Sequence, residues 1–224
     1  RDLMNGCKIS HIIDFGEKGF KGVKIETINI MLHTKQKPGL VEIESLTTND
    51  VTVKKQSYLT DGNFPYWLIY RNKKFDEIAN KLEFNVFNSY RDRKLTKSNT
   101  AKSGKIRVLK SRNIGNNEII DIDGYDTFVD DITGLDVGRF MNRENCFLIP
   151  NLTYNPRACR LPKDSITDGS VAILTLKDDE IEISDNDLKF YATDEFTEFY
   201  SIARNKGTRS LNIDNNSVFF FSVI

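Results

Sequence analysis

The chain has 224 residues, and its 32 basic and 32 acidic side chains give a formal net charge of zero. Hydrophobic residues make up 39% of it and charged residues 29%, which excludes a disordered or fibrous protein. No apolar run approaches the ~20 residues of a membrane-spanning helix, so we expect no membrane segment. Three widely spaced cysteines predict neither a disulfide framework nor a zinc site, and they favour the reducing cytoplasm.

The first segment has the pattern of two strands joined by a glycine-rich connection. Ile9–Phe15 and Val23–Leu32 are rich in Ile and Val, and the second alternates apolar with polar residues. The loop Lys35–Gly39 contains a Pro-Gly turn and predicts a domain boundary near residue 37. Because the chain begins at Arg1 without an initiator Met or a secretory signal, we expect a piece of a longer polypeptide.

The middle of the chain predicts a strand pair and a helix. Val41–Lys55 resembles two strands separated by a turn near Asn49. Beyond Pro65, the residues Phe75, Ile78, Ala79 and Leu82 have the spacing of one helix face. The polar, basic stretch Lys94–Gly104 has no apolar period and predicts the entry to another domain. We therefore expect residues 38–94 to connect two larger parts.

The last part, residues 95–224, predicts short strands followed by a long helix. Strands are expected at Ile106–Leu109, Cys146–Pro150 and Ser170–Leu176. Ser184 and Asp187 resemble a capping box. A buried helix stripe should follow it, formed by Leu188, Ala192, Phe196, Phe199 and Ala203 and ended by Gly207. The apolar run Val218–Phe221 predicts a final strand. The fold class is therefore α+β, richer in strand than in helix.

The order of these segments resembles a known family. Residues 12–17, 20–23 and 26–28 (IIDFGE, FKGV and ETI) resemble the last strands of the catalytic domain in bacterial N6-adenine DNA methyltransferases of type II and type IIG restriction–modification systems. Residues 105–110, 147–151 and 207–212 look like the target recognition domain of the same enzymes, and are more distantly similar to type I specificity subunits. The resemblance implies that residues 1–37 complete the edge of a doubly wound methyltransferase sheet, and that residues 95–224 recognise DNA.

Two features of the family do not occur in the chain. It has no Asn-Pro-Pro-Tyr or Asp-Pro-Pro-Tyr motif, and no glycine-rich loop of the kind that binds S-adenosylmethionine. The resemblance then implies a catalytic methyltransferase domain upstream in the same polypeptide, where S-adenosylmethionine would bind. The chain alone should hold no cofactor and methylate nothing, and its expected partner is double-stranded DNA.

Recognition of duplex DNA needs cations for the phosphates and Arg, Asn or Gln side chains for base edges. Arg107, Lys110 and Arg112 follow a strand pattern and suit phosphate contact, although a solvated strand face has the same pattern. The loop after the Cys146–Pro150 strand is the candidate for base readout, and it offers Asn151, Tyr154, Asn155, Arg157 and Arg160. Its Asn residues also suit local turns.

Four further residues have two interpretations each. Arg204, Lys206 and Arg209 lie around the end of the long helix, where the helix dipole favours cations with or without DNA. Phe20 lies in the glycine-flanked loop and matches by order the aromatic that related methyltransferases place against a flipped adenine. A phenylalanine between two strands is also a common core residue.

Three rival functions remain open. A non-enzymatic DNA-specificity subunit would carry the reading domain without methyltransferase strands. A metal-dependent nuclease would use the acidic stretch 118–131, which contains Asp121, Asp123, Asp126, Asp130 and Asp131. A protein-interaction module is compatible with the zero net charge. Residues 9–34 argue against the first rival. The second lacks a Glu-x-Lys near these aspartates, and His11 and His33 have no Cys or His at ligand spacing.

Overall fold

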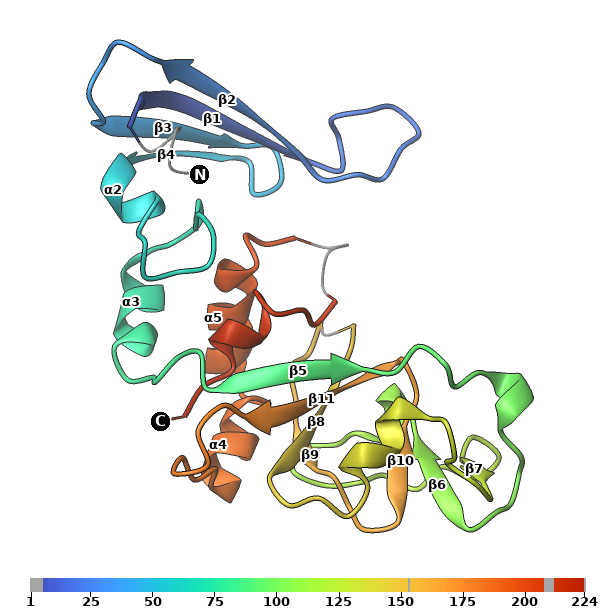
Figure 1. Cartoon of the computed structure of the whole chain (residues 1–224). Helices are drawn as coiled ribbons and strands as arrows, with labels where there is room; N and C mark the ends of the chain where they lie inside the picture. The colour runs from blue at the N-terminus through green and yellow to red at the C-terminus, as the bar shows by residue number, and fades with distance from the viewer. Residues whose placement is uncertain (1–5, 153, 208–211, 224) are drawn as a thin grey trace. The chain divides into compact units, whose positions relative to one another are not determined.

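The computed structural model describes residues 6–152, 154–207 and 212–223. The fold is mixed α+β and rich in strands, as expected (Figure 1). The chain forms two compact units. Unit 1 comprises residues 1–76 and 201–210, and unit 2 comprises residues 77–200 and 211–224. Within the described ranges, no helix is long and apolar enough to cross a membrane.

Unit 1 is built on a four-stranded sheet in the order β2-β1-β3-β4, drawn in blue in Figure 1. Its strands are β1 (Lys8–Gly16), β2 (Thr27–His33), β3 (Leu40–Ser45) and β4 (Asp50–Lys55). β1 lies in the middle, antiparallel to β2 and parallel to β3. The boundary expected at residue 37 therefore falls inside one sheet, because the 34–39 loop only carries the chain across to the other side of β1.

One face of this sheet is buried and the other is open. Ile9, Ile12, Val41 and Ile43 are 0–2% exposed and form the covered face. Gln56 begins the short helix α2 (Gln56–Leu59), accepts a hydrogen bond from Ile9 N at 2.8 Å and donates one to the Cys7 carbonyl at 2.8 Å. This side chain fixes the start of β1 to the chain that leaves β4. The connection continues to α3 (Lys73–Ala79).

Unit 2 contains two sheets. The first is antiparallel, with the order β5-β11-β8-β9, and the second has the order β10-β6-β7. The first consists of β5 (Phe87–Arg91), β11 (Val171–Leu176), β8 (Cys146–Pro150) and β9 (Cys159–Arg160). The second consists of β10 (Ser165–Thr167), β6 (Ile106–Leu109) and β7 (Thr127–Val129). Short 3₁₀ turns complete the unit: η1 (Lys97–Asn99), η2 (Ser111–Asn113), η3 (Asp136–Phe140) and η4 (Val218–Phe220).

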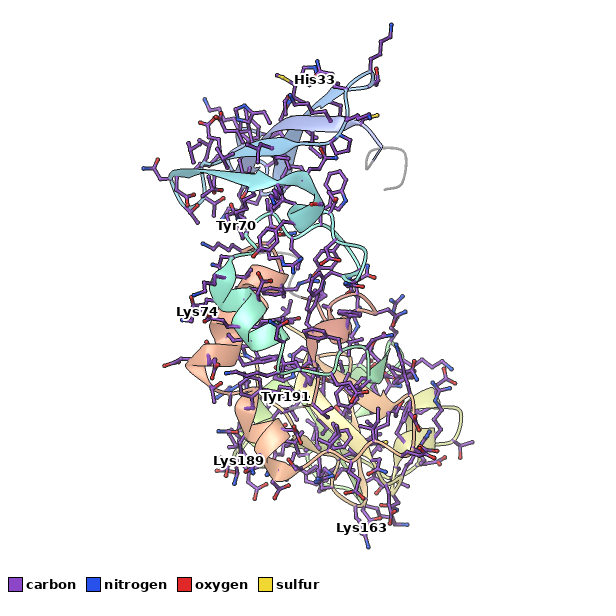
Figure 2. All side chains as sticks on the ribbon, turned by 90° about the vertical axis from the view of Figure 1, so that its left-hand side faces the viewer. His33, Tyr70, Lys74, Lys163, Lys189 and Tyr191 are labelled. Carbon is purple, nitrogen blue, oxygen red and sulfur yellow. The ribbon has the colours of Figure 1, made fainter. Side chains whose placement is uncertain are left out.

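An aromatic cluster holds the helical side of unit 2. Phe196 has no exposed surface, and its ring lies 5.0 Å from Tyr191 and 5.3 Å from Phe221, between centroids. Figure 2 labels Tyr191, which is also fully covered and donates its hydroxyl proton to the Ser222 carbonyl. Burial raises the pKa of the Tyr191 hydroxyl far above its ordinary value. The aromatic residues near the chain end are therefore core.

Two expected elements differ from the structure. The long helix is two helices, α4 (Asp185–Phe190) and α5 (Asp194–Ala203), because Thr193 accepts a hydrogen bond from Phe196 N at 3.1 Å and starts a new helix. The capping box of Ser184 and Asp187 is confirmed. The strand expected at 218–221 is instead η4, and it follows a turn in which Asp214 accepts a hydrogen bond from Ser217 N at 2.7 Å.

The structure also divides the chain differently from the expected parts 1–37, 38–94 and 95–224. Its unit boundaries fall at residues 76/77, 200/201 and 210/211. Residues 38–76 belong to unit 1 because β3 pairs with β1, and residues 77–94 belong to unit 2 because β5 pairs with β11. Hydrogen bonds between strands distant in sequence set these boundaries.

Candidate functional site

The three basic residues expected along the β6 strand converge on one acidic loop. Arg107 forms ion pairs with Asp121 at 2.5 Å and with Asp126 at 2.6 Å. The Lys110 ammonium lies 3.9 Å from the centre of the Tyr125 ring, and the Arg112 guanidinium lies 4.8 Å from it. Two oppositely charged clusters, separate in the sequence, therefore meet in space. Arg107 ties the acidic loop to β6, whereas Arg112 stays exposed.

The loop after β8 contains both structural and exposed residues. Asn151 is only 7% exposed, and its amide donates to the Asn212 side chain at 2.9 Å. Arg160 donates to the Ile183 carbonyl at 2.5 Å and lies over the Phe147 ring. These two side chains are engaged in the fold. Tyr154, 64% exposed, and Asn155 face solvent.

Arg157 joins this loop to the chain after β6. Its guanidinium donates to the carbonyl oxygens of Ile114 at 2.6 Å, Ser111 at 3.1 Å and Asn155 at 3.1 Å. Burial lowers the pKa of Arg157. The clamp brings the exposed residues of the two segments into one neighbourhood. We call Arg112, Asn116, Tyr154 and Asn155 the reading surface. Asn116 is exposed there and was not predicted, because an isolated Gly-Asn-Asn turn carries no pattern specific to binding.

The acidic stretch 118–131 is distributed among local partners. Besides the two carboxylates held by Arg107, Asp130 accepts a hydrogen bond from Lys105 N at 3.1 Å. Asp131 accepts hydrogen bonds from the Thr133 hydroxyl at 2.7 Å and from Thr133 N at 2.8 Å, and these bonds lower the pKa of the Asp131 carboxyl. Across the residues that the structure describes, no three His, Cys, Asp or Glu side chains are grouped so as to hold a metal ion.

Phe20 lies in the connection between β1 and β2 and is 60% exposed. The core role considered for it is therefore wrong. The same connection exposes Val23 and Ile25 together with Lys18, Lys21 and Lys24. Gly16 starts it with φ of +52°, and a side chain there would meet the Thr47 hydroxyl at 2.5 Å, so the connection needs a glycine at this position.

Unit 1 has a pocket of about 590 Å³ at the edge where β1 and β3 end, which we call the β1 pocket. Three separate stretches supply its aromatic and basic lining: the start of the β1–β2 connection, the 66–69 segment and the segment after α5. They place Lys18, Tyr66, Trp67, Arg204 and Lys206 around it. Arg204, expected to contact DNA, is thus a pocket residue. Arg209 lies outside the described residues.

The wall of the β1 pocket is fixed by Asn205. Its side chain accepts a hydrogen bond from Ile69 N at 2.8 Å and donates one to the Trp67 carbonyl at 2.8 Å. Tyr66 adds a bond from its hydroxyl to the Ala203 carbonyl at 2.8 Å. The end of α5 and the aromatic segment therefore form one rigid wall. Sequence reasoning missed Tyr66 and Trp67, because only the fold brings the end of α5 to residues 66–69.

A buried polar network lies next to the β1 pocket and shares Asp14 with its lining. The Tyr70 hydroxyl bonds to the Asp14 carboxylate and lies 2.6 Å from the Ser45 hydroxyl. Asp14 and Ser45 are paired in the β1–β3 register. Burial, and then the bond to Asp14, raise the pKa of Tyr70 to about 12. Tyr70, labelled in Figure 2, thus links the ends of the two strands that border the pocket.

No family model and no curated protein matches this sequence.

Proposed function

We propose that this protein binds duplex DNA and reads a short sequence through the reading surface of unit 2. The observation that carries the proposal is the Arg157 clamp, which holds two loops together so that Arg112, Tyr154 and Asn155 are exposed in one neighbourhood. An Arg suits guanine or phosphate, and an Asn suits the edge of adenine. Loops whose backbone is already held by such bonds lose less backbone freedom on binding.

Within this class, we propose that the chain is the target-recognising part of an adenine-N6 DNA methyltransferase of a restriction–modification system. The order of motifs in residues 12–28 and 105–212 supports this, and so does the exposed Phe20, which is free to stack on a base. Methyl transfer from S-adenosylmethionine would belong to a catalytic domain upstream in the same polypeptide. Because residues 12–28 resemble the last strands of a methyltransferase domain, we propose that β1 and β2 adjoin that catalytic domain.

Unit 1 offers a surface on which a catalytic domain can dock. β2 is an edge strand of its sheet, and Ile28, Met31 and Leu32 on it are 38–53% exposed. An exposed apolar edge strand is a template for pairing with a further strand. In the proposed assembly, the methyltransferase sheet continues from this edge.

The test is binding of the chain to a mixed-sequence duplex pool across a salt series, followed by sequencing of the bound fraction. We expect affinity to fall log-linearly with salt and one short sequence to be enriched. Asn155→Ala should relax the preference at one position, since a good base contact is worth about 1–3 kcal/mol of discrimination. Arg112→Gln should weaken binding.

Lys163→Gln is the matched control, because Lys163 is an exposed lysine elsewhere on unit 2 (Figure 2). Equal binding by all variants, or enrichment of no sequence, would contradict the reading surface. Cleavage of the pool in the presence of Mg²⁺ would instead indicate the rival function, a metal-dependent nuclease that uses the acidic stretch 118–131. A specificity subunit would be favoured by a different result. The sequence preference would be complete, and Phe20→Ala would leave methylation by the complete enzyme unchanged.

A further inference from the structure

Lys206 occupies an unusual backbone position at the β1 pocket. Asn205 and Lys206 have φ of +50° and +54°, so two consecutive non-glycine residues adopt the left-handed conformation. Side chains other than Asn or Asp rarely adopt it, and it persists where surrounding contacts enforce it, often at ligand sites. Here the enforcing contacts are the two bonds from Asn205 to the 67–69 segment. The fold therefore holds a lysine in the left-handed conformation beside a pocket, at the end of α5, where its N–H donates to the Ser201 carbonyl at 2.8 Å.

Among the residues that the structure describes, none balances the charge of Lys206 with a carboxylate. Its ammonium lies 4.9 Å from the centre of the Tyr70 ring, and in the described part of the chain no carboxylate lies within ion-pair distance of it. The pKa of Lys54 is lowered, mainly by burial, and repulsion from Lys206 acts in the same direction. Two cations thus lie near each other, and an anion beside Lys206 would relieve their repulsion.

The carboxylates of the pocket are occupied. Asp14 accepts hydrogen bonds from Gly16 N at 2.9 Å and from the Tyr70 hydroxyl. Glu17 and Glu26 also line the pocket and have interactions of their own. Arg204 lies on the same wall, 3.4 Å from the Tyr66 hydroxyl through one guanidinium nitrogen. The segment after α5 thus contributes two cations, Arg204 and Lys206, to a lining that also contains Trp67, and the Glu26 carboxylate lies close to Gly207.

We propose that the β1 pocket binds a sugar–phosphate unit of the DNA backbone, with Lys206 and Arg204 at the phosphate and Trp67 against the sugar. This inference rests on the proposed function and adds a second DNA contact, on unit 1, to the reading surface of unit 2. A phosphate contact of this kind positions the duplex and carries no base preference. The volume of about 590 Å³ accommodates a phosphodiester with its sugar.

Trp67 is the one tryptophan of the chain, so its fluorescence reports on the pocket directly. The experiment titrates the complete chain with three probes: inorganic phosphate, deoxyadenosine monophosphate and the duplex enriched by selection. DNA binding is followed in parallel by the anisotropy of a dye on the duplex. We expect duplex DNA to change the Trp67 emission with the same midpoint as the anisotropy.

Lys206→Asn removes the cation and keeps a residue that tolerates the left-handed conformation. We expect it to make the slope of log affinity against log salt shallower by about one and to leave the selected sequence unchanged. Lys206→Arg should restore the slope. Lys163→Gln is again the exposed-lysine control, and circular dichroism confirms that each variant is folded.

The outcomes separate the two proposals. DNA binding with silent Trp67 and an unchanged slope in Lys206→Asn would overturn the pocket assignment and leave the reading surface standing. A Trp67 response to phosphate or to the mononucleotide, without DNA binding, would overturn the assignment to DNA and identify a small-anion site. Unchanged duplex binding by Arg112→Gln and Asn155→Ala, together with a Trp67 response to duplex, would support the pocket while contradicting the reading surface.

Discussion

The sheet of unit 1 and the antiparallel sheet of unit 2 differ in how their strands are covered. All five residues of β8 are buried, and so are five of the six in β11. In β2 and β4 no residue is buried. The exposed strands β2 and β4 and the buried strand β11 each contain two Ile or Val residues, so apolar composition alone does not decide burial. Unit 2 has a core of its own, whereas unit 1 keeps apolar strand surface that suits contact with another protein.

The largest expected difference is in the free energy of unfolding. Truncating a core side chain of unit 2 should lower it far more than truncating an exposed side chain of unit 1. Phe196→Ala removes a fully buried ring at the centre of the aromatic cluster and should lower the free energy of unfolding by about 3–5 kcal/mol. Val53→Ala on β4, 59% exposed, should change it by less than about 0.5 kcal/mol. Urea unfolding monitored by circular dichroism measures both, and equal effects would contradict the comparison.

The next effect concerns the polar network under the β1 pocket. Tyr70→Phe removes the hydroxyl that Asp14 and Ser45 share and should cost about 1–3 kcal/mol, because a buried carboxylate loses a donor.

The same residue gives a pH dependence. The pKa of Tyr70 is raised in the folded state to about 12, from an ordinary value near 10. Its contribution to stability is therefore complete below pH 10, and is lost as the pH rises from about 10 to about 12 while the unfolded chain ionises first. Unfolding midpoints in that range should fall less steeply for Tyr70→Phe than for the original chain. Identical slopes would exclude Tyr70 as a source of alkaline sensitivity.

A smaller effect is expected at the end of α5. Asn205→Ala loses two hydrogen bonds and places a β-carbon in a left-handed backbone, and should cost about 1–2 kcal/mol. Asn205→Gly loses the same bonds without the strain and should cost less. Thermal unfolding of the pair separates the two contributions. A glycine variant as unstable as the alanine variant would assign the whole effect to the bonds.

The smallest effect on stability is expected on the open face of unit 1. Val51 and Val53 are 60% and 59% exposed, and the double variant Val51→Thr, Val53→Thr makes both side chains polar. The free energy of unfolding should stay within about 0.5 kcal/mol of that of the original chain. Self-association, followed by sedimentation velocity, should decrease if this face is an unpaired contact surface. A large loss of stability would show that the face is part of the core.

Local patterns in the sequence predicted many elements. The alternating and Ile-rich segments became β1 to β4, and the strands β6, β8 and β11 lie where short apolar runs predicted them. Of the predicted stripe, Leu188, Phe196, Phe199 and Ala203 are fully buried, as the spacing indicated, whereas Ala192 lies between α4 and α5 and is only partly buried. The helix broke at Thr193 because a threonine and two acidic residues made a new start, which the apolar spacing concealed.

The candidate site was less predictable. The charges of Arg107, Asp121 and Asp126 are interpretable one by one, but only the fold shows that they neutralise each other. Asn151 was expected to be free for readout and is instead bonded to Asn212, 61 residues further along the chain. Pairings over such distances depend on strand register and loop closure, which local composition does not encode.

By itself, the sequence determined an α+β chain with amphipathic strands, a capped helix and glycines where the backbone needs them, because these features follow from the conformational preferences of neighbouring residues. The tertiary structure alone decided that β3 joins β1, that Arg157 clamps two loops and that Lys206 reaches the β1 pocket. Each of these depends on burial and hydrogen bonds between residues far apart in the chain, and such contacts form only when the whole unit folds.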